Sequence, residues 1–307
     1  MTYIVDFAKS LKRKANIPLT IYLVLNITII EILLSSLFHA SNTVVTFLLG
    51  LGVYAISLVI ALSPVGEWIL RMQSGCKAIK RKDQIDCIEP IFKEVLKKAR
   101  KLDPSVPADV TLYMNDSKDV NAFATGRKTI CITEGMLNAP EEQIKATLAH
   151  EMGHLAHKDT DLILLVSVGN FIVTFIFIAI RMFARAISLF FSLLAIFGGG
   201  SNRGVALGLS LYAFMCDVIL GALMWVWTKI GIMLVMKSSR DNEFEADKFA
   251  FNLGHGNALC ELLDSSLIGS STKGLFANLI NSHPDKNERI AALMNLGTTY
   301  NKSYGAK

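Results

Sequence analysis

The stretch "TLAHEMGHLAHKD", residues 147–159, decides the architecture because it sets metal-binding side chains directly before a long apolar block. In a helix, His150 and His154 lie one turn apart, about 40° around the axis, so both imidazoles can reach one ion. Glu151 lies beside the first histidine, from where it can touch a metal-bound water without binding the metal. The alternative is a helix with two solvated histidines. The pattern predicts a metal-dependent hydrolase with Glu151 as general base.

Apolar residues are gathered into long blocks in this 307-residue chain, which is 52% hydrophobic and has a mean hydropathy of +0.42. A helix that crosses a bilayer needs about 20 mainly apolar residues. A further stretch, 187–197, is too short to cross and is expected to lie at the interface or to extend the third block. The four predicted spans are Ile17–Phe38, Val44–Leu62, Leu162–Ile180 and Ala206–Trp227.

Charge and cysteine usage exclude some classes of protein. The net charge of +5 is mild and its excess lies beside apolar blocks, so nucleic-acid binding is not expected. The five cysteines are odd in number, far apart and form no CxxC pair. A disulfide framework and a thiolate metal site are therefore not expected, and a reducing compartment fits better.

Basic residues that flank the spans predict the orientation. They precede the first span and follow the second, whereas the short loop "HASNT" between these spans has none. Both termini and the region 65–160 are therefore expected on the cytoplasmic side, and the glycine-rich loop 197–204 on the other side. On this interpretation three basic residues fall in the outer loop, against the general bias: Arg181, Arg185 and Arg203.

The soluble portion is split by the second pair of spans. Residues 87–102 and 139–159 have the character of helices, while "VTLYMN" and "TICIT" alternate like half-buried strands. We therefore expect a mainly α integral membrane protein with four transmembrane helices and a cytoplasmic, zincin-like α+β catalytic domain with a short sheet. The expected order is a transmembrane hairpin (1–64), a first catalytic segment (65–161), a second transmembrane hairpin (162–236) and a second catalytic segment (237–307).

A zinc hydrolase needs a third protein ligand, and "NEFEAD", residues 242–247, offers two glutamates. Asp247 follows Glu243 by four residues, on the same helix face. From there Asp247 can accept a hydrogen bond from the outer N–H of a zinc-bound histidine. Glu245 has Phe249 at that offset, which cannot accept a hydrogen bond. The alternative is an ordinary acidic helix face. The expected ligands of one zinc ion per chain are His150, His154 and Glu243.

The order "HEMGH", apolar hairpin, "NEFEAD" resembles the HtpX-type membrane zinc metalloproteases, relatives of the CAAX prenyl proteases. The resemblance includes "NAFA", 121–124, and "HPDKNER", 283–289. It implies that Asn121, Ala122 and Phe123 line a cleft as an edge strand that pairs with an extended substrate, since main-chain pairing holds varied sequences in one register. The alternative is an ordinary hairpin edge.

The resemblance also implies roles for His283 and Arg289, which match the family's HP-x-x-x-x-R pattern. Both would sit by the active site, where cationic donors can stabilise the oxyanion of a tetrahedral intermediate. Taken alone, the segment is typical of a helix start with Pro284 at the first helical position.

Two acids lie inside predicted spans, Glu31 and Asp217. Charges there are costly and mark a functional pathway by default. The alternative, which we favour, is that both face the bundle interior, protonated or bonded to groups such as Asn26 or Asn170.

Together these features predict a multi-pass zinc endopeptidase of the cell (inner) membrane with a cytoplasmic active site. Its expected partners are polypeptide substrates and the lipid bilayer, and the resemblance implies misfolded membrane proteins as substrates. Two alternatives stay open: a dedicated processing peptidase of the CAAX type, and an inactive membrane scaffold with a structural zinc. Glu151 argues against the scaffold, because a structural site does not need it.

Overall fold

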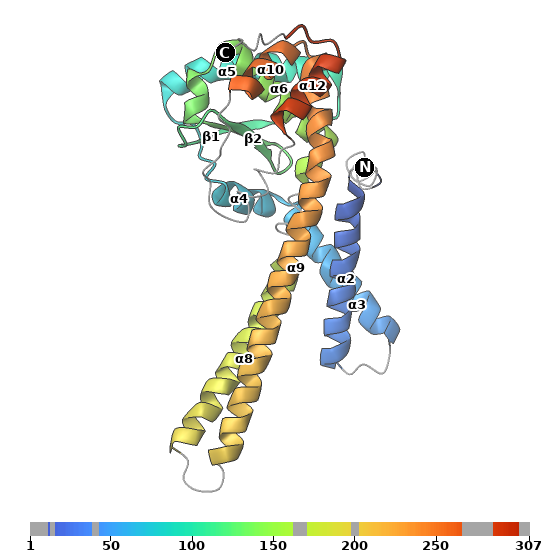
Figure 1. Ribbon diagram of the computed structural model, residues 1–307, viewed down its shortest axis with the longest axis vertical. Helices are drawn as coiled ribbons and strands as arrows, with labels where there is room; N and C mark the ends of the chain where they lie inside the picture. The colour runs from blue at the N-terminus through green and yellow to red at the C-terminus, as the bar shows by residue number, and fades with distance from the viewer. Residues whose placement is uncertain are drawn as a thin grey trace, which may run out of the picture. The chain divides into compact units, whose positions relative to one another are not determined.

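The computed structural model of the protein describes residue 12 and residues 16–38, 43–161, 171–197, 203–265 and 285–300. Within these residues the chain is mostly helical and has a small sheet (Figure 1). The contacts between residues divide the chain into two compact units. Unit 1 comprises Met1–Tyr22, Leu58–Val168 and Leu234–Lys307, and unit 2 comprises Leu23–Ser57 and Gly169–Met233.

Unit 2 consists of apolar helices. It contains most of α2 (Ile17–Phe38), most of α3 (Thr43–Ala61), α8 (Phe171–Phe197) and the first portion of α9 (Arg203–Asn252). By length and composition, the described residues include two helices that can cross a membrane. A third is added if α3 and the bent helix after it count as one span. In α2 only a shorter apolar stretch qualifies, so four crossings stay a prediction.

The third predicted span extends beyond its expected end at Ile180. Helix α8 runs to Phe197, and its apolar window within the described residues is Phe177–Leu194. The stretch 187–197 therefore extends this helix. The expectation that Arg181 and Arg185 lie in an outer loop is wrong, because both lie inside α8. A portion of the predicted span, 162–170, falls outside the described residues.

An ion-pair cluster explains how α8 tolerates its arginines. Asp217 of α9 accepts hydrogen bonds from Nε of Arg181 at 2.7 Å and from Nε of Arg185 at 2.9 Å. Figure 1 shows α8 and α9 side by side along this stretch. The sequence prediction named Asn26 and Asn170 as possible partners of Asp217, but the arginines take that place. Residue 170 is outside the described residues, and Asn26 accepts from Trp227.

Unit 1 holds a three-stranded sheet in the order β1-β3-β2. Strand β1 (Thr111–Asn115) pairs parallel with β3 (Thr129–Thr133), and β2 (Ala122–Thr125) pairs antiparallel with β3. The expectation that "TICIT" is half buried is wrong, since all five residues of β3 are buried. The strand is central in the sheet. The buried hydroxyl of Thr133 has a hydrogen-bond partner, because it donates to the carbonyl of Asn121 at 2.7 Å.

Helices pack against this sheet to form the core of unit 1. Figure 1 shows α5, α6, α10 and α12 grouped on one side of the sheet, and α4 on the other side. Buried apolar side chains of the strands, of these four helices and of the C-terminal end of α9 form one cluster. The helix bounds are α4 Pro64–Gln73, α5 Lys82–Leu102, η2 Glu134–Asn138, α6 Glu141–His157, α10 Gly256–Ser265 and α12 Lys286–Asn295.

Helix α6 has the boundaries that its sequence dictates. Pro140 is the N-cap residue, and Glu141 and Glu142 occupy the first turn, where the helix dipole favours acids. The helix ends because Lys158 adopts a left-handed conformation with φ 60°. The chain therefore changes direction four residues after His154, and does not continue as one straight helix toward residue 162.

We expect Asp217→Asn to lower the thermal stability of the purified protein, because it leaves two guanidinium groups in an apolar hairpin without a counter-charge. The double change Asp217→Asn with Arg181→Met should recover some of the loss, since it removes one uncompensated charge. Thermal unfolding in detergent measures both. Equal melting temperatures for the wild type and Asp217→Asn would show that the cluster does not stabilise the hairpin.

Candidate metal centre and active site

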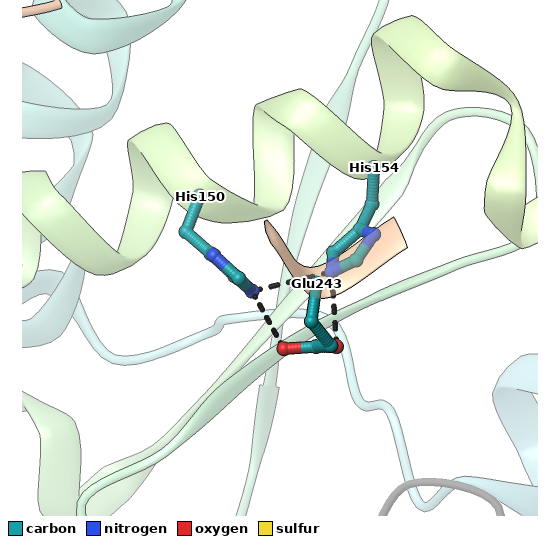
Figure 2. A group of neighbouring side chains, drawn as sticks. All are labelled: His150, His154 and Glu243. Atoms are coloured by element: carbon teal, nitrogen blue, oxygen red, sulfur yellow. Dashed lines mark hydrogen bonds and ion pairs between the residues drawn. The ribbon is translucent and has the colours of Figure 1, made fainter. Parts of the chain in front are cut away.

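Helix α6 presents His150 and His154 from adjacent turns, and Glu243 of α9 faces both (Figure 2). The two Nε2 atoms are 3.2 Å apart. Glu243 places Oε2 3.5 Å from Nε2 of His150 and Oε1 3.4 Å from Nε2 of His154. The structure thus brings the three predicted ligands together as a group that could hold a metal ion.

The spacing of these atoms suits zinc. A tetrahedral zinc ion with bonds of about 2.0–2.1 Å to nitrogen and oxygen puts its ligand atoms roughly 3.3–3.4 Å apart. The two Nε2 atoms, 3.2 Å apart, agree with this edge length. Each oxygen of Glu243 lies near a different imidazole, Oε2 3.5 Å from Nε2 of His150 and Oε1 3.4 Å from Nε2 of His154, and with one ligand atom per residue the three atoms lie within 4.8 Å of one another. Two imidazoles and one carboxylate also form a donor set of catalytic zinc sites, which keep a fourth position open for water or substrate.

The charge around the site favours a cation. Four buried carboxylates, on Glu151, Asp159, Glu243 and Asp247, surround it, and Arg289 is the buried guanidinium beside them. Burial by itself lowers the pKa of His154, but its contacts with Asp159 and Glu243 outweigh burial and raise the pKa well above its usual value. The same negative field that holds a proton on an imidazole attracts a metal cation when the imidazoles are neutral.

Asp247 holds the first histidine from behind. Its Oδ1 is 2.9 Å from Nδ1 of His150, the contact that the four-residue spacing from Glu243 predicts. Burial raises the pKa of Asp247, but the charge of Arg289 outweighs burial and keeps the pKa low. An ionised Asp247 fixes the proton of His150 on Nδ1 and leaves Nε2 to face the ion.

Arg289 lies on α12 and contacts the two acids of α9. Its Nε donates to Asp247 Oδ2 at 2.8 Å and one terminal nitrogen donates to Oδ1 at 2.6 Å. The other terminal nitrogen is 3.1 Å from Glu243 Oε2. The guanidinium thus contacts both the candidate ligand Glu243 and Asp247, the carboxylate behind His150. His283, its predicted companion, lies outside the described residues.

A carboxylate that the sequence pattern did not reveal stands behind the second histidine. Asp159 places Oδ2 3.3 Å from Nδ1 of His154 and is buried. It matches Asp247 in function, since each carboxylate can orient one ligand imidazole. The signal in the sequence is the acid two residues after the end of α6, but only the left-handed turn at Lys158 brings it back to the histidine.

Gly153 allows α6 and α9 to pack closely against each other. A Cβ at this position would lie 3.0 Å from Cα of Ala246 and 3.0 Å from Cβ of Phe249, both on α9. The glycine therefore lets α9 come close enough for Glu243 to reach the histidines of α6. The spacing of residues within α6 does not indicate this contact, because it depends on a second helix.

Glu151 faces the edge of the sheet. Its Oε2 accepts a hydrogen bond from the backbone N–H of Ala124 in β2 at 2.6 Å. In this antiparallel pair the N–H of Thr133 donates to the carbonyl of Asn121, so the alternation of the ladder turns the N–H and C=O groups of Ala122 and Ala124 away from β3. Strand β2 is thus an edge strand of the described sheet, as expected for "NAFA".

Comparison with known proteins gives consistent matches. Residues 88–296 match the sequence model of "Peptidase family M48". The chain is 28% identical over 251 residues to "Protease HtpX" of Shewanella frigidimarina, covering 75% of this chain and 82% of that protein. It is also 28% identical over 248 residues to "Protease HtpX" of Idiomarina loihiensis, covering 75% and 79%. The matched family range includes every residue of the metal-site geometry above.

A solved structure, that of S. mikatae Ste24p, is similar to this chain with a TM-score of 0.41 and 19% sequence identity. The alignment covers 95% of this chain and 65% of that one.

We expect Glu243→Ala to lose most bound zinc, because it removes one of three protein ligands. The matched control is Glu245→Ala, which changes an exposed glutamate two residues away on the same helix. Zinc per chain after dialysis, measured by mass spectrometry of the metal, separates the two variants. Equal zinc loss from both would contradict the ligand assignment.

Asp159→Asn should weaken zinc binding by about 10- to 100-fold, the usual effect of losing a carboxylate that orients a ligand histidine. Competition with a fluorescent zinc chelator measures the affinity. Asp241→Asn, at an exposed position, is the control and should bind zinc like the wild type. Unchanged affinity in Asp159→Asn would remove Asp159 from the site.

Proposed function

The chain belongs to peptidase family M48 and is a metalloprotease similar to the HtpX proteases, and on this basis we propose that it is a membrane-bound zinc endopeptidase. The observation that carries the proposal is the triangle of His150, His154 and Glu243 with Glu151 beside it. We further propose that its substrates are membrane or membrane-associated proteins, cleaved on the cytoplasmic side in the course of protein quality control.

The proposed mechanism rests on the two carboxylate oxygens of Glu151, which have different partners. A zinc ion at the three ligands supplies Lewis-acid polarisation of a peptide carbonyl and lowers the pKa of a water molecule. Glu151 keeps Oε2 on the N–H of Ala124, which orients its carboxylate. Its other oxygen, Oε1, then accepts the proton of the attacking water and returns a proton to the leaving nitrogen.

Substrate binding is assigned to the free edge of β2. The N–H and C=O of Ala122 and the C=O of Ala124 face away from β3, so an extended peptide can pair with these groups as a further strand, while the N–H of Ala124 stays bonded to Glu151. In this arrangement Asn121, Ala122 and Phe123 line the cleft. The contact between Ala124 and Glu151 supports this assignment, because a peptide bond paired along β2 lies close to the general base.

Arg289 has a different role in this proposal from the one that the family resemblance implies. Its three nitrogens point at Asp247 and Glu243, and its side chain is buried. These contacts favour a positioning residue, which holds the ligand Glu243 and the supporting Asp247, over direct stabilisation of an oxyanion. His283 is kept as a proposed active-site residue on the resemblance alone.

The membrane arrangement is likewise proposed. We assign residues 1–64 and 162–236 to membrane hairpins and residues 65–161 and 237–307 to the two cytoplasmic catalytic segments, in a multi-pass protein of the cell membrane. The candidate spans of α8 and α9 support the second hairpin. The apolar exposed side chains of α2 and α3 support the first one.

Glu151→Gln should retain zinc and lose activity, because Gln keeps the size of the side chain but cannot accept the proton. Removing a general base typically costs about 10²- to 10⁴-fold in rate. Casein cleavage and zinc content of the wild type, Glu151→Gln and the exposed control Glu245→Gln are measured in parallel. An inactive scaffold predicts no metal-dependent cleavage by the wild type.

The same variant identifies the substrates. Proteins that stay bound to Glu151→Gln in membranes are crosslinked and identified by mass spectrometry. Membrane proteins of varied sequence support the quality-control proposal, whereas a single class of prenylated proteins would instead support a processing peptidase.

A further inference from the structure

A bend separates α3 from α4. The helix over Phe47–Ala61 and α4 are bent by 63° relative to each other. Gly66 makes this corner possible, because a Cβ there would lie 1.9 Å from the carbonyl oxygen of Ala61. Ser63 caps α4 by accepting from the N–H of Val65 at 3.2 Å. These local contacts explain why the helix breaks between Ala61 and Pro64.

The inner face of α4 is bound to the turn between β2 and β3. Glu67 Oε1 accepts from the N–H of Arg127 at 3.1 Å, and the Arg127 side chain donates to the carbonyl of Leu62 at 3.1 Å. Arg71 lies 3.4 Å from Oγ1 of Thr129, and it covers the ring of Tyr113 at 5.2 Å. Helix α4 is thus fixed to the hairpin that contains the edge strand β2.

The outer face of α4 is an apolar stripe without a cover in the described structure. Val65, Trp68 and Met72 follow at positions i, i+3 and i+7 and are 56%, 55% and 60% exposed. By contrast Gly66 and Leu70, on the inner face, are buried. A tryptophan on the apolar face of an amphipathic helix is typical of helices that lie in the interface of a bilayer.

We propose that this stripe, Val65, Trp68 and Met72, rests in the interfacial layer of the bilayer, so that α4 holds the substrate-binding edge β2 at the membrane surface. A lipid surface is the occupant that fits, because α4 directly continues from α3, whose exposed residues near the corner are also apolar. Exposed basic residues follow α4, where lipid headgroups are expected: Lys77, Lys80, Arg81 and Lys82.

The two attachments of α4 explain how so short a helix can stay at the membrane surface. A helix of 10 residues has little membrane affinity alone, but α3 tethers it at one end and the β2–β3 turn at its inner face. The inference rests on the proposed membrane attachment of the chain, and it does not depend on peptidase activity. It places the proposed substrate-binding edge β2 near the surface from which a membrane-embedded substrate segment emerges.

The depth of Trp68 tests the proposal directly. The full-length wild type and Trp68→Phe are reconstituted in phosphatidylcholine vesicles whose lipids carry bromine at shallow or deep acyl positions. The difference between the two proteins isolates the fluorescence of Trp68 from that of Trp225 and Trp227. We expect quenching that is strongest for shallow bromine. A Trp68 signal that no brominated lipid quenches, whether from water or from a covering protein copy, would overturn the proposal, as would strongest quenching by deep bromine.

An activity test addresses the consequence for substrates. Trp68→Glu should lower cleavage of a membrane-embedded substrate severalfold more than cleavage of casein, because a charge repels the stripe from the interface. Gln73→Glu, an equal charge change at the exposed end of α4, is the control and should affect both substrates alike. Equal losses on both substrates in Trp68→Glu would contradict the proposal. If the wild type cleaves neither substrate, the proposed peptidase function fails, while the quenching result still decides the place of α4.

Discussion

The paired hydrogen bonds between Arg289 and Asp247 are the interaction on which the metal site depends. They join α12 to α9, and Asp247 in turn joins α9 to His150 on α6. All three side chains are buried, so each charge is stable only because the other is present. Removing one partner of a buried pair typically costs about 3–5 kcal/mol, since it leaves an uncompensated charge. The helix α12 therefore supports the candidate metal site although it supplies none of its ligands.

This interaction also sets the chemical state of the ligands. Arg289 keeps Asp247 ionised, Asp247 holds the proton of His150 on Nδ1, and the free lone pair of Nε2 then faces the other ligands. The third guanidinium nitrogen reaches Glu243, so one cation orients two ligands from behind. Asp159 orients the remaining histidine. Each ligand thus has a partner that fixes its direction before any ion binds.

Features that depend on spacing within one helix were predictable from the sequence. The convergence of the two histidines and the position of Asp247 four residues after Glu243 are of this kind. The edge strand at "NAFA" is implied by the family resemblance instead, and β2 over Ala122–Thr125 lies at the edge of the described sheet. Features that depend on chain reversal or on pairing between helices were not. Asp159 reaches its histidine through a left-handed turn, and the arginines of α8 are tolerated because Asp217 lies on another helix. The burial of β3 follows from its central place in the sheet, which alternation alone does not show.

The edge strand β2 connects the elements of the catalytic unit. At one end its turn is bonded to α4 through Glu67 and Arg127, and along its length the N–H of Ala124 holds the carboxylate of Glu151. If substrate pairs with this edge as proposed, the peptide is aligned by the same backbone that orients Glu151, the proposed general base. Such alignment does not depend on the side chains of the substrate, because main-chain groups make the pairing. On the proposed function, pairing through main-chain groups accepts substrates of many sequences, and the position of the edge strand relative to the membrane then contributes to which proteins are cleaved.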